Sequence, residues 1–232
     1  MSNIPYVSIR SSKVELFDQF ARIGKALSSG LRIEILDLLA QAESSVDVLA
    51  QTLGQSTQNI SQHLQILRQT KLITSRKEGN FVMYRITSDE IVGLVASLQT
   101  VAHKYLSEVD EILDRFTSHH EEFEPLDADE LIKRARDGSV TVLDVRPPKE
   151  FGVGHLPGAV NVPLNQLEKM FKTLPADTKV VAYCRGKYCL MAYAAVDYLK
   201  SIGISAQRLD VGFSEWRLGH FPVENGLAMD KP

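Results

Sequence analysis

In the first half of the chain, apolar residues recur every three or four positions, which is the spacing of a helix with one buried face. Ser45 and Ser56 precede two such segments, 46–53 and 57–69, and their hydroxyls can cap the helices. Gly54 ends the first segment, as glycine often does at a helix C-terminus. The pattern therefore predicts two short helices joined by a tight turn.

Farther along, the pattern changes to two short strands at 72–76 and 81–87, separated by 77–80, and the last residues of this connection have the chemistry of a hairpin turn. One long amphipathic helix over 88–116 follows, with a continuous apolar stripe. This stripe is longer than one small domain can cover, so we expect the helix to pack against its copy in a second subunit.

The second half of the chain alternates between the two kinds of element. Its expected strands are 140–145, 179–183 and 206–209, and its expected helices are 128–136, 164–172 and 189–201. Strand and helix in turn predict an α/β domain with a mostly parallel central sheet. The polar segment 119–125 is the predicted linker between a helical domain with a small hairpin, 1–118, and the α/β domain, 126–226.

Composition narrows the class of protein. The chain of 232 residues has no apolar run of the roughly 20 residues that cross a bilayer, and its N-terminus does not have the form of a signal peptide. Its two cysteines, Cys184 and Cys189, lie in one short segment, whereas a secreted scaffold would spread them along the chain. We therefore expect a cytoplasmic protein with reactive thiols.

Charge is distributed unevenly along the chain. The net charge of −3 argues against binding of polyanions by the whole surface. Between positions 55 and 85, however, five basic residues accompany the single acid Glu78. This local excess fits a surface that meets DNA, although an ordinary solvated face would have the same balance.

Two helices joined by a glycine-containing turn and followed by a basic hairpin form the layout of a winged helix-turn-helix. Polar side chains at the start of the second helix can reach base edges in the major groove. The hairpin would contact phosphates or the minor groove and fix the register. The candidate DNA-binding residues are Ser56, Thr57, Gln58, Asn59, Gln62, His63, Arg68, Arg76, Lys77 and Asn80.

This region resembles the ArsR family of bacterial repressors, through the runs 61–68, 71–73 and 78–80 and the pair Tyr84 and Arg85. The resemblance covers roughly 17–116 and implies a homodimer that binds an operator with imperfect dyad symmetry. A winged helix used only for protein contacts is the alternative. The metal sites known in this family are not expected here, because no cysteine precedes position 184.

Another group of polar residues lies in segment 143–163, where an Asp-x-Arg pair ends a strand and a glycine-rich turn carries a histidine. The guanidinium of the arginine could hold a nearby glutamate or a backbone turn. We interpret the group as an internal brace of the site and not as a catalytic set. Its members are Asp144, Arg146, Glu150 and His155.

Cys184 follows a buried strand and precedes a helix. The backbone N–H groups of such a turn, together with the helix N-terminus, lower the pKa of a thiol and stabilise an anionic sulfur. Arg185 and Lys187 add positive charge for an anionic sulfur donor. Cys184 is therefore the candidate catalytic nucleophile.

The chain resembles the rhodanese family over about 124–225, through the Asp-x-Arg element, the Gly-His-x-Pro-Gly-Ala element and the cysteine loop, in that order. Gly212, Trp216 and 222–223 extend the match. The resemblance implies sulfur transfer without a metal or organic cofactor: Cys184 becomes a persulfide and passes its outer sulfur to an acceptor thiol or to cyanide. The loop amides that would cradle the persulfide belong to Arg185, Gly186, Lys187, Tyr188 and Cys189.

The loop departs from the usual family pattern, Cys-Arg-x-Gly-x-Arg, at two positions. Gly186 comes one place early, and Cys189 stands where the last arginine would be. Either Cys189 resolves a modified Cys184 into an internal disulfide or polysulfide, or it is a small buried residue at the start of the helix. The sequence leaves both alternatives open.

Three functions fit these features. The one we favour is a transcriptional regulator whose rhodanese-like domain accepts or senses sulfane sulfur at Cys184 and so modulates operator binding. The second is a thiosulfate or persulfide sulfurtransferase that uses its winged helix for dimerisation or recruitment, and the third is a regulator with an idle rhodanese-like domain. The expected partners are operator DNA, a sulfane-sulfur donor, a thiol acceptor and a second copy of the chain, with no membrane.

Overall fold

The computed structural model describes residues 6–115, 128–170 and 179–226, and the predicted linker 119–125 lies outside them. The chain divides into two compact units, Met1–Ile91 and Val92–Pro232. We call them the first and the second unit and describe each by itself. In the described residues, no helix is both long enough and apolar enough to cross a membrane.

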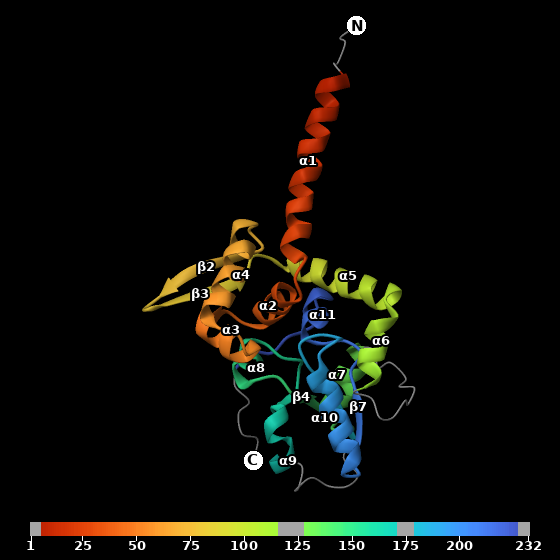
Figure 1. Cartoon of the computed structure of the whole chain (residues 1–232). Helices are drawn as coiled ribbons and strands as arrows, with labels where there is room; N and C mark the ends of the chain where they lie inside the picture. Colours follow the sequence, from red (N-terminus) through yellow and green to blue (C-terminus); the bar gives the residue numbers. More distant parts are fainter. Residues whose placement is uncertain (1–5, 116–127, 171–178, 227–232) are drawn as a thin grey trace. The chain divides into compact units, whose positions relative to one another are not determined.

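The first unit contains four helices and a small antiparallel sheet in its described part (Figure 1). The sheet has the strand order β1-β3-β2. In chain order the elements are α1 (Tyr6–Leu27), α2 (Gly30–Gln41), β1 (Ser44–Ser45), α3 (Val46–Leu53), α4 (Thr57–Gln69), β2 (Ile73–Glu78) and β3 (Phe81–Ile86).

The pair α3 and α4 has the bounds that the sequence predicts, and both predicted caps are present. The Ser45 hydroxyl accepts a hydrogen bond from the amide of Val48 at 3.4 Å, and the Ser56 hydroxyl accepts one from the amide of Asn59 at 3.2 Å. Gly54 ends α3 with φ of 61°, a left-handed conformation that glycine adopts at low cost. The inner face of α4 is buried through Ile60, Leu64 and Leu67.

The hairpin is longer on its first strand than the sequence suggests. Arg76 pairs with Met83 and Glu78 with Phe81, so only Gly79 and Asn80 form the turn. The prediction that all of 77–80 belongs to the connection is therefore wrong. Two-residue turns match the twist of the flanking strands, and Gly79 has the required positive φ of 58°.

The predicted single helix over 88–116 is also wrong in detail, because it is broken into α5 (Asp89–Tyr105) and α6 (Ser107–Asp114). Leu106 between them has extended backbone, with φ of −116° and ψ of 104°. Nε2 of His103 lies 2.7 Å from Oδ1 of Asp110 and holds the two helices across this bend. Neither proline nor glycine marks the break, so the sequence pattern runs through it.

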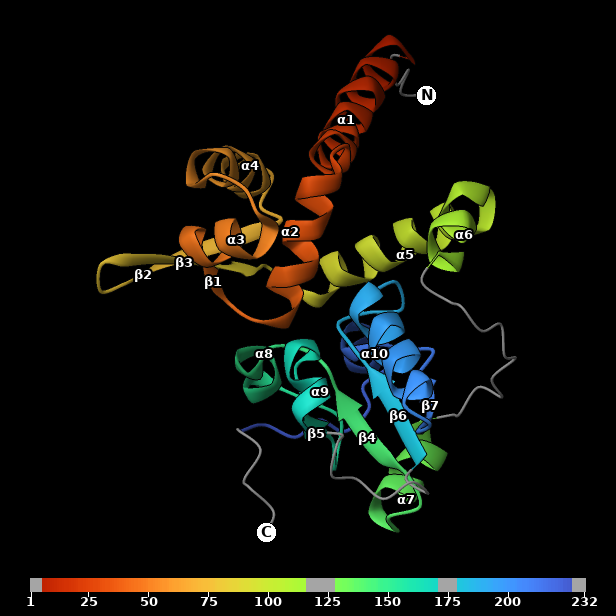
Figure 2. The same ribbon diagram turned by 60° about the horizontal axis from the view of Figure 1, so that its bottom comes forward.

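The second unit also contains an α/β fold with a four-stranded sheet, and the predicted fold class is confirmed (Figure 2). All three strand pairs are parallel, in the order β5-β4-β6-β7. The elements are α7 (Ala128–Arg136), β4 (Thr141–Asp144), α8 (Pro148–Val153), β5 (Val160–Asn161), η1 (Leu164–Gln166), α9 (Leu167–Met170), β6 (Lys179–Tyr183), α10 (Leu190–Ser201), β7 (Ser205–Arg208) and α11 (Phe213–Leu218).

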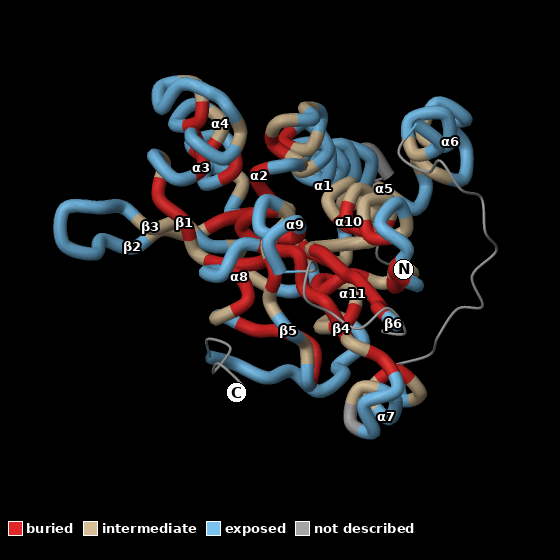
Figure 3. Tube along the Cα trace, turned by 90° about the horizontal axis from the view of Figure 1, so that it is seen from below, coloured by how far each residue is buried: buried red, intermediate tan, exposed pale blue. Residues whose placement is uncertain are grey.

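Side chains of β4 and β6 alternate between two buried clusters, as the two-residue period of a strand requires. On one face, Leu143 and Ala182 pack with residues of α9 and α10. On the other face, Val142 and Val181 pack with residues of α7 and α11, including Trp216. Figure 3 shows β4 and β6 as buried segments, whereas the β2–β3 hairpin of the first unit is largely exposed.

Three elements of the second unit were not expected from periodicity, namely α8, β5 and α11. All are short, and each lies in a segment whose pattern is dominated by glycine, proline or polar residues. The predicted helix 164–172 begins as the 3₁₀ turn η1, and its last two positions lie outside the described residues. These short elements carry several residues of the site described next.

Candidate functional site

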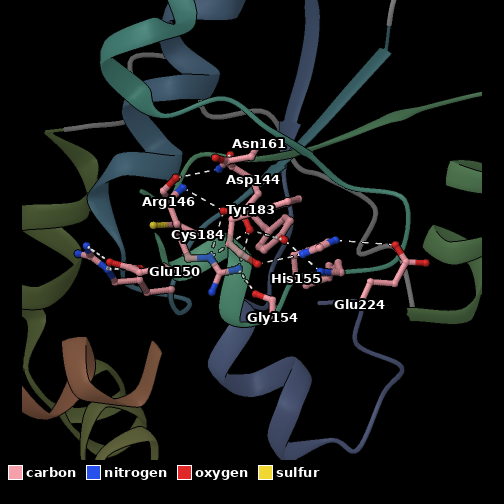
Figure 4. A network of polar contacts seen from close by, with 12 residues as sticks. Asp144, Arg146, Glu150, Gly154, His155, Asn161, Tyr183, Cys184 and Glu224 are labelled. Atoms are coloured by element: carbon pink, nitrogen blue, oxygen red, sulfur yellow. Dashed lines mark hydrogen bonds and ion pairs between the residues drawn. The ribbon is translucent and has the colours of Figure 1, made fainter. Parts of the chain in front are cut away.

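A buried ion pair lies at the carboxyl end of β4. Asp144 and Arg146 are both 0% exposed, and Nη2 of Arg146 lies 2.6 Å from Oδ2 of Asp144 (Figure 4). Nε of Arg146 adds a second contact at 3.0 Å to Oδ1, and the backbone N–H of Arg146 donates to the same oxygen at 2.9 Å. Because each charge is paired and hydrogen-bonded, the pair is tolerated in an apolar interior.

The ion pair also connects β4 to its neighbours. The Tyr183 hydroxyl at the end of β6 donates to Oδ2 of Asp144 and accepts from the amide of Leu156 at 3.1 Å. Burial beside the Asp144 carboxylate raises the pKa of Tyr183 well above its usual value, so the hydroxyl remains a donor. Nη2 of Arg146 donates to the carbonyl of Gly154 at 2.7 Å, which is the backbone-turn alternative expected for this arginine.

Glu150 of α8 pairs with the loop that follows β6. Its carboxylate accepts from Nη2 of Arg185 at 2.7 Å and from Nε of Arg185 at 2.9 Å, a bidentate geometry. Glu150 itself is buried. The positive charge of Arg185, which the sequence assigns to an anionic sulfur donor, is therefore largely compensated by Glu150.

His155 joins the turn after α8 to the C-terminal segment. Its ring stacks on Phe151 with centroids 3.7 Å apart, and Nδ1 lies 3.0 Å from the carbonyl of Phe151. Nε2 lies 3.8 Å from Oε2 of Glu224, and the backbones of His155 and Glu224 form an antiparallel bridge. These contacts tie the turn after α8 to the C-terminal segment.

Cys184 directly follows β6 and is buried, and Cys189 occupies the N-cap position of α10 and is half-buried. The two cysteines form a disulfide, with their Cα atoms 6.1 Å apart. Between them the loop is tight, since the amide of Cys189 donates to the carbonyl of Gly186 at 3.0 Å. The structure thus brings both thiols of the chain together in one short loop.

The N-terminal residues of α11 hold this loop through backbone hydrogen bonds. The amide of Phe213 donates to the carbonyl of Cys184 at 2.9 Å, and the amide of Ser214 donates to the carbonyl of Arg185 at 2.8 Å. Oε1 of Glu215 accepts from the amide of Lys187 at 3.2 Å. The amides of Lys187 and Cys189 therefore donate away from Cys184 in this form, so the predicted cradle from all five loop amides is not assembled here.

Glu215 was missed in the sequence analysis. Its other oxygen, Oε2, accepts from the amide of Gly212 at 2.9 Å, so the glutamate at the third helical position satisfies the N-cap amide of α11. Glutamate three positions after a helix start is only half of the capping-box signature, because the N-cap residue here is glycine and has no hydroxyl to complete it. This partial signal opens a helix of only six residues that shows no periodicity.

Gly212 is needed for close approach of two backbones. A Cβ atom at this position would lie 2.3 Å from Cα of Gly186 and 2.4 Å from its nitrogen. Only glycine at 212 lets α11 reach the cysteine loop, because backbone atoms cannot move aside as a flexible side chain can. From the sequence, Gly212 enters only through the resemblance to the rhodanese family, and the close approach of the two backbones is the physical reason for it.

Tyr188 in the cysteine loop contacts α5 within the second unit. Its hydroxyl lies 3.0 Å from Nδ1 of His103, and the two rings pack edge to face with centroids 5.3 Å apart. The same His103 contacts Asp110 of α6 through its other nitrogen. A chain of polar contacts therefore connects the cysteine loop with the bend between α5 and α6.

Most of the candidate DNA-binding residues are exposed on the first unit: Ser56, Thr57, Gln58, Gln62, Arg68, Arg76, Lys77 and Asn80. Asn59 and His63 are only partly exposed. The side-chain amide of Asn59 donates to Oε1 of Gln55 at 2.9 Å. Burial and, to a smaller extent, the charge of Arg32 lower the pKa of His63. These two side chains are thus less accessible for base contact than their position in α4 suggests.

Arg76 on the hairpin has two acidic partners. It lies 2.8 Å from Oε2 of Glu43 and 2.5 Å from Oε2 of Glu78. Arg85 also approaches Glu43, at 3.8 Å. The excess of basic residues was counted over positions 55–85. Glu43 lies twelve positions before that range but contacts the hairpin in space, so the count omits it.

No group of three or more histidine, cysteine, aspartate or glutamate side chains that could hold a metal ion occurs among the described residues.

The fold and the site together define a class of protein. Residues 127–218 match the rhodanese-like domain, and residues 27–76 match a helix-turn-helix domain. The chain is an ArsR-type winged helix-turn-helix fused to a C-terminal rhodanese domain.

One relative matches nearly the whole of this chain. This chain is 41% identical over 217 residues to the HTH-type transcriptional regulator Rv0324 of Mycobacterium tuberculosis, and the match covers 94% of this chain and 95% of that protein. The chain belongs to the same family of HTH-type transcriptional regulators.

Other relatives match the DNA-binding half alone. The uncharacterised HTH-type transcriptional regulator Rv0081 of the same species is 33% identical over 40% of this chain and 82% of its own length. A solution structure of the homodimeric winged helix-turn-helix domain of Mb0332 from Mycobacterium bovis is 35% identical, with a TM-score of 0.39, over 53% of this chain and 97% of that one.

The close approach at Gly212 gives a stability prediction. Replacing Gly212 by Ala places a methyl group against the backbone of Gly186, so we expect the free energy of unfolding to fall by about 1–3 kcal/mol. Chemical denaturation of the reduced protein measures this loss. The control is Gly93→Ala in α5, where a Cβ meets nothing within 4 Å; equal stability of the two variants would contradict the proposed packing.

Proposed function

We propose that this transcriptional regulator accepts sulfane sulfur at Cys184 and that sulfur loading changes its affinity for operator DNA. The main observation behind this proposal is the position of Cys184 between a buried strand and a helix N-terminus. Its loop is held by contacts from α8, α10 and α11. The same chain presents an exposed recognition helix and wing. A thiol so placed suits sulfur chemistry, and an exposed polar helix suits a DNA groove.

The sulfur step balances without a metal or cofactor. The Cys184 thiolate attacks the outer sulfur of thiosulfate, the new S–S bond forms, and sulfite leaves with the electron pair of the broken bond. With a persulfide donor, a thiolate leaves instead. In the disulfide form Cys184 cannot act as a nucleophile, so a cellular dithiol must first reduce the bond to Cys189.

The support for DNA binding comes from the first unit. Gln58 and Gln62 are exposed on α4 and have amide groups suited to bidentate contact with adenine. Lys77 is exposed on the wing and suits a phosphate. We therefore assign recognition of the DNA bases to α4, and positioning of the protein along the DNA backbone to the wing.

The support for a homodimer comes from apolar side chains left uncovered in one chain. Val101 and Tyr105 of α5 are 56% and 70% exposed, and Phe17 and Phe20 of α1 are 57% and 59% exposed. Exposed apolar stripes of this kind mark contacts with another protein surface. A second copy of the chain is the partner we propose, so that two recognition helices face an operator with dyad symmetry.

Coupling between sulfur and DNA requires that loading favour one state of the DNA-binding region. The contact of Tyr188 with His103 offers a physical route, since it joins the cysteine loop to α5, the helix that carries part of the exposed apolar stripe. A loop that changes shape on loading would alter this contact. The alternative function, a sulfurtransferase whose winged helix serves dimerisation or recruitment, shares the sulfur step but needs no such route.

The central test replaces Cys184 by Ser. We expect the reduced variant to gain no sulfur from thiosulfate or inorganic polysulfide, and its basal affinity for promoter DNA to remain within about twofold of the parent, because the replacement lies outside the DNA-binding unit. Intact mass and fluorescence anisotropy measure the two properties. Sulfite release by the parent without a change in affinity would favour the sulfurtransferase, and no sulfite release by the parent would favour an idle domain.

The DNA interface makes a separate prediction. Lys77→Ala should weaken binding to all sequences and lower the slope of log K against log salt by about 1, since one phosphate contact is lost. Gln62→Ala should instead cost about 1–3 kcal/mol on the operator alone. Titration of operator and random duplexes at several salt concentrations separates the two effects, and an unchanged salt slope in Lys77→Ala would remove the wing from the interface.

The coupling route predicts a defect in Tyr188→Phe, which removes the hydroxyl that meets His103 but keeps the ring. We expect the change in DNA affinity per sulfite released from thiosulfate to shrink by about threefold or more, since allosteric coupling commonly amounts to 1–3 kcal/mol. Sulfite release is measured on the same samples, so that altered loading is not mistaken for altered coupling. A full response per sulfite would exclude this contact from the route.

A further inference from the structure

We propose that Cys189 is a resolving residue that attacks the Cys184 persulfide, expels sulfide and leaves the internal disulfide. This inference rests on the proposed acceptance of sulfur by Cys184. It adds a second reactive group to the site and a second product, hydrosulfide. It also identifies the state in which the loaded protein comes to rest, which is a disulfide and not a persulfide.

The first support is the direct bond between the two sulfur atoms. The Cα atoms lie 6.1 Å apart, within the range of about 4.4–6.8 Å that disulfides require, so the bond needs no further movement of the backbone. The loop has little freedom to separate the cysteines. At its start, the carbonyl of Cys184 accepts a hydrogen bond from the amide of Phe213. At its end, Cys189 is the N-cap residue of α10.

The second support is the position of Cys189 itself. It is the N-cap of α10, a helix of 12 residues, and its side chain makes no capping hydrogen bond. The positive end of the helix dipole favours an anionic sulfur at this position. Cys189 is also half-buried while Cys184 is buried, so the attacking residue is the more accessible of the two cysteines.

The third support is the direction of the loop amides. The amide of Lys187 donates to Glu215, and that of Cys189 donates to the carbonyl of Gly186. Neither donates toward Cys184, and the Arg185 guanidinium is bound by Glu150. A persulfide anion in this loop has fewer donors than a full amide cradle would give it, which favours its onward reaction.

The chemistry balances in two steps. The Cys189 thiolate attacks the inner sulfur of the Cys184 persulfide, the Cys184–Cys189 bond forms, and hydrosulfide leaves with the electron pair of the broken S–S bond. A cellular dithiol then reduces the disulfide and is itself oxidised, which returns both thiols. Overall, one sulfane sulfur is reduced to sulfide and one dithiol is oxidised. An intramolecular attack competes well with an external acceptor because its partners are already in place.

The test uses thiosulfate with the reduced full-length protein under anaerobic conditions. Thiosulfate leaves as sulfite, so any sulfide comes only from the second step. For the parent we expect one sulfite and one sulfide per chain, and an intact mass lower by two hydrogens. For Cys189→Ser we expect sulfite without sulfide, and a mass higher by one sulfur that maps to Cys184.

Two replacements separate chemistry from capping. Serine is a good N-cap and alanine a poor one, so Cys189→Ser and Cys189→Ala affect the start of α10 in opposite directions. Both should extend the lifetime of the persulfide at least about tenfold, since the intramolecular nucleophile is lost in both. A long lifetime in the alanine variant alone would show a structural effect and overturn the proposal.

The remaining outcomes distinguish the two proposals. A parent protein that releases sulfite and keeps a stable extra sulfur would overturn the role of Cys189 while supporting acceptance by Cys184. A disulfide formed without an equal amount of sulfide would also overturn it. Parent, serine and alanine variants that all release no sulfite, with inorganic polysulfide giving no added sulfur either, would refute the proposed function and this inference together.

Discussion

The second unit depends on one buried ion pair, Asp144 with Arg146. A charge pair in an apolar interior is tolerated only when nearly every donor and acceptor is satisfied, and here the remaining bonds go to the ends of neighbouring elements. Tyr183 brings the end of β6 against β4, and Gly154 brings in the turn after α8. The pair therefore fixes the edge of the sheet from which the cysteine loop starts. Loss of one partner would leave the other charge buried, so the effect would reach the loop although neither residue touches sulfur.

From this fixed edge, the loop is enclosed by short elements that come from distant parts of the sequence. Glu150 on α8 holds Arg185, and Glu215 on α11 holds the amide of Lys187. Both carboxylates act on the loop from outside, and both compensate groups that would otherwise serve an anion. The site is consequently less positive than its basic residues suggest.

Local signals in the sequence were sufficient for much of this structure. The caps of α3 and α4 and the parallel sheet follow from residues near in sequence, because caps and periodicity act over one or two turns, whereas the two families were indicated by motif resemblance. Three features were not accessible in this way. The bend at Leu106 is held by His103 and Asp110 without a helix-breaking residue, the pairing of Arg76 involves Glu43, and the support of the loop by Glu215 crosses 28 positions. Each depends on contacts that form only after the chain has folded.

The pairing of Arg76 with Glu43 has a consequence for how the wing meets a nucleic acid. In the DNA interface proposed above, a phosphate that approaches Arg76 must displace the Glu43 carboxylate already bound there. Such competition penalises every duplex alike and weakens binding to random sequence. Because the same cost falls on the specific site, the ratio of specific to random binding is unchanged and only the absolute affinity falls. In the proposed interface, a single acidic residue outside the binding helix therefore sets how much protein is needed to occupy DNA, without changing which site is preferred.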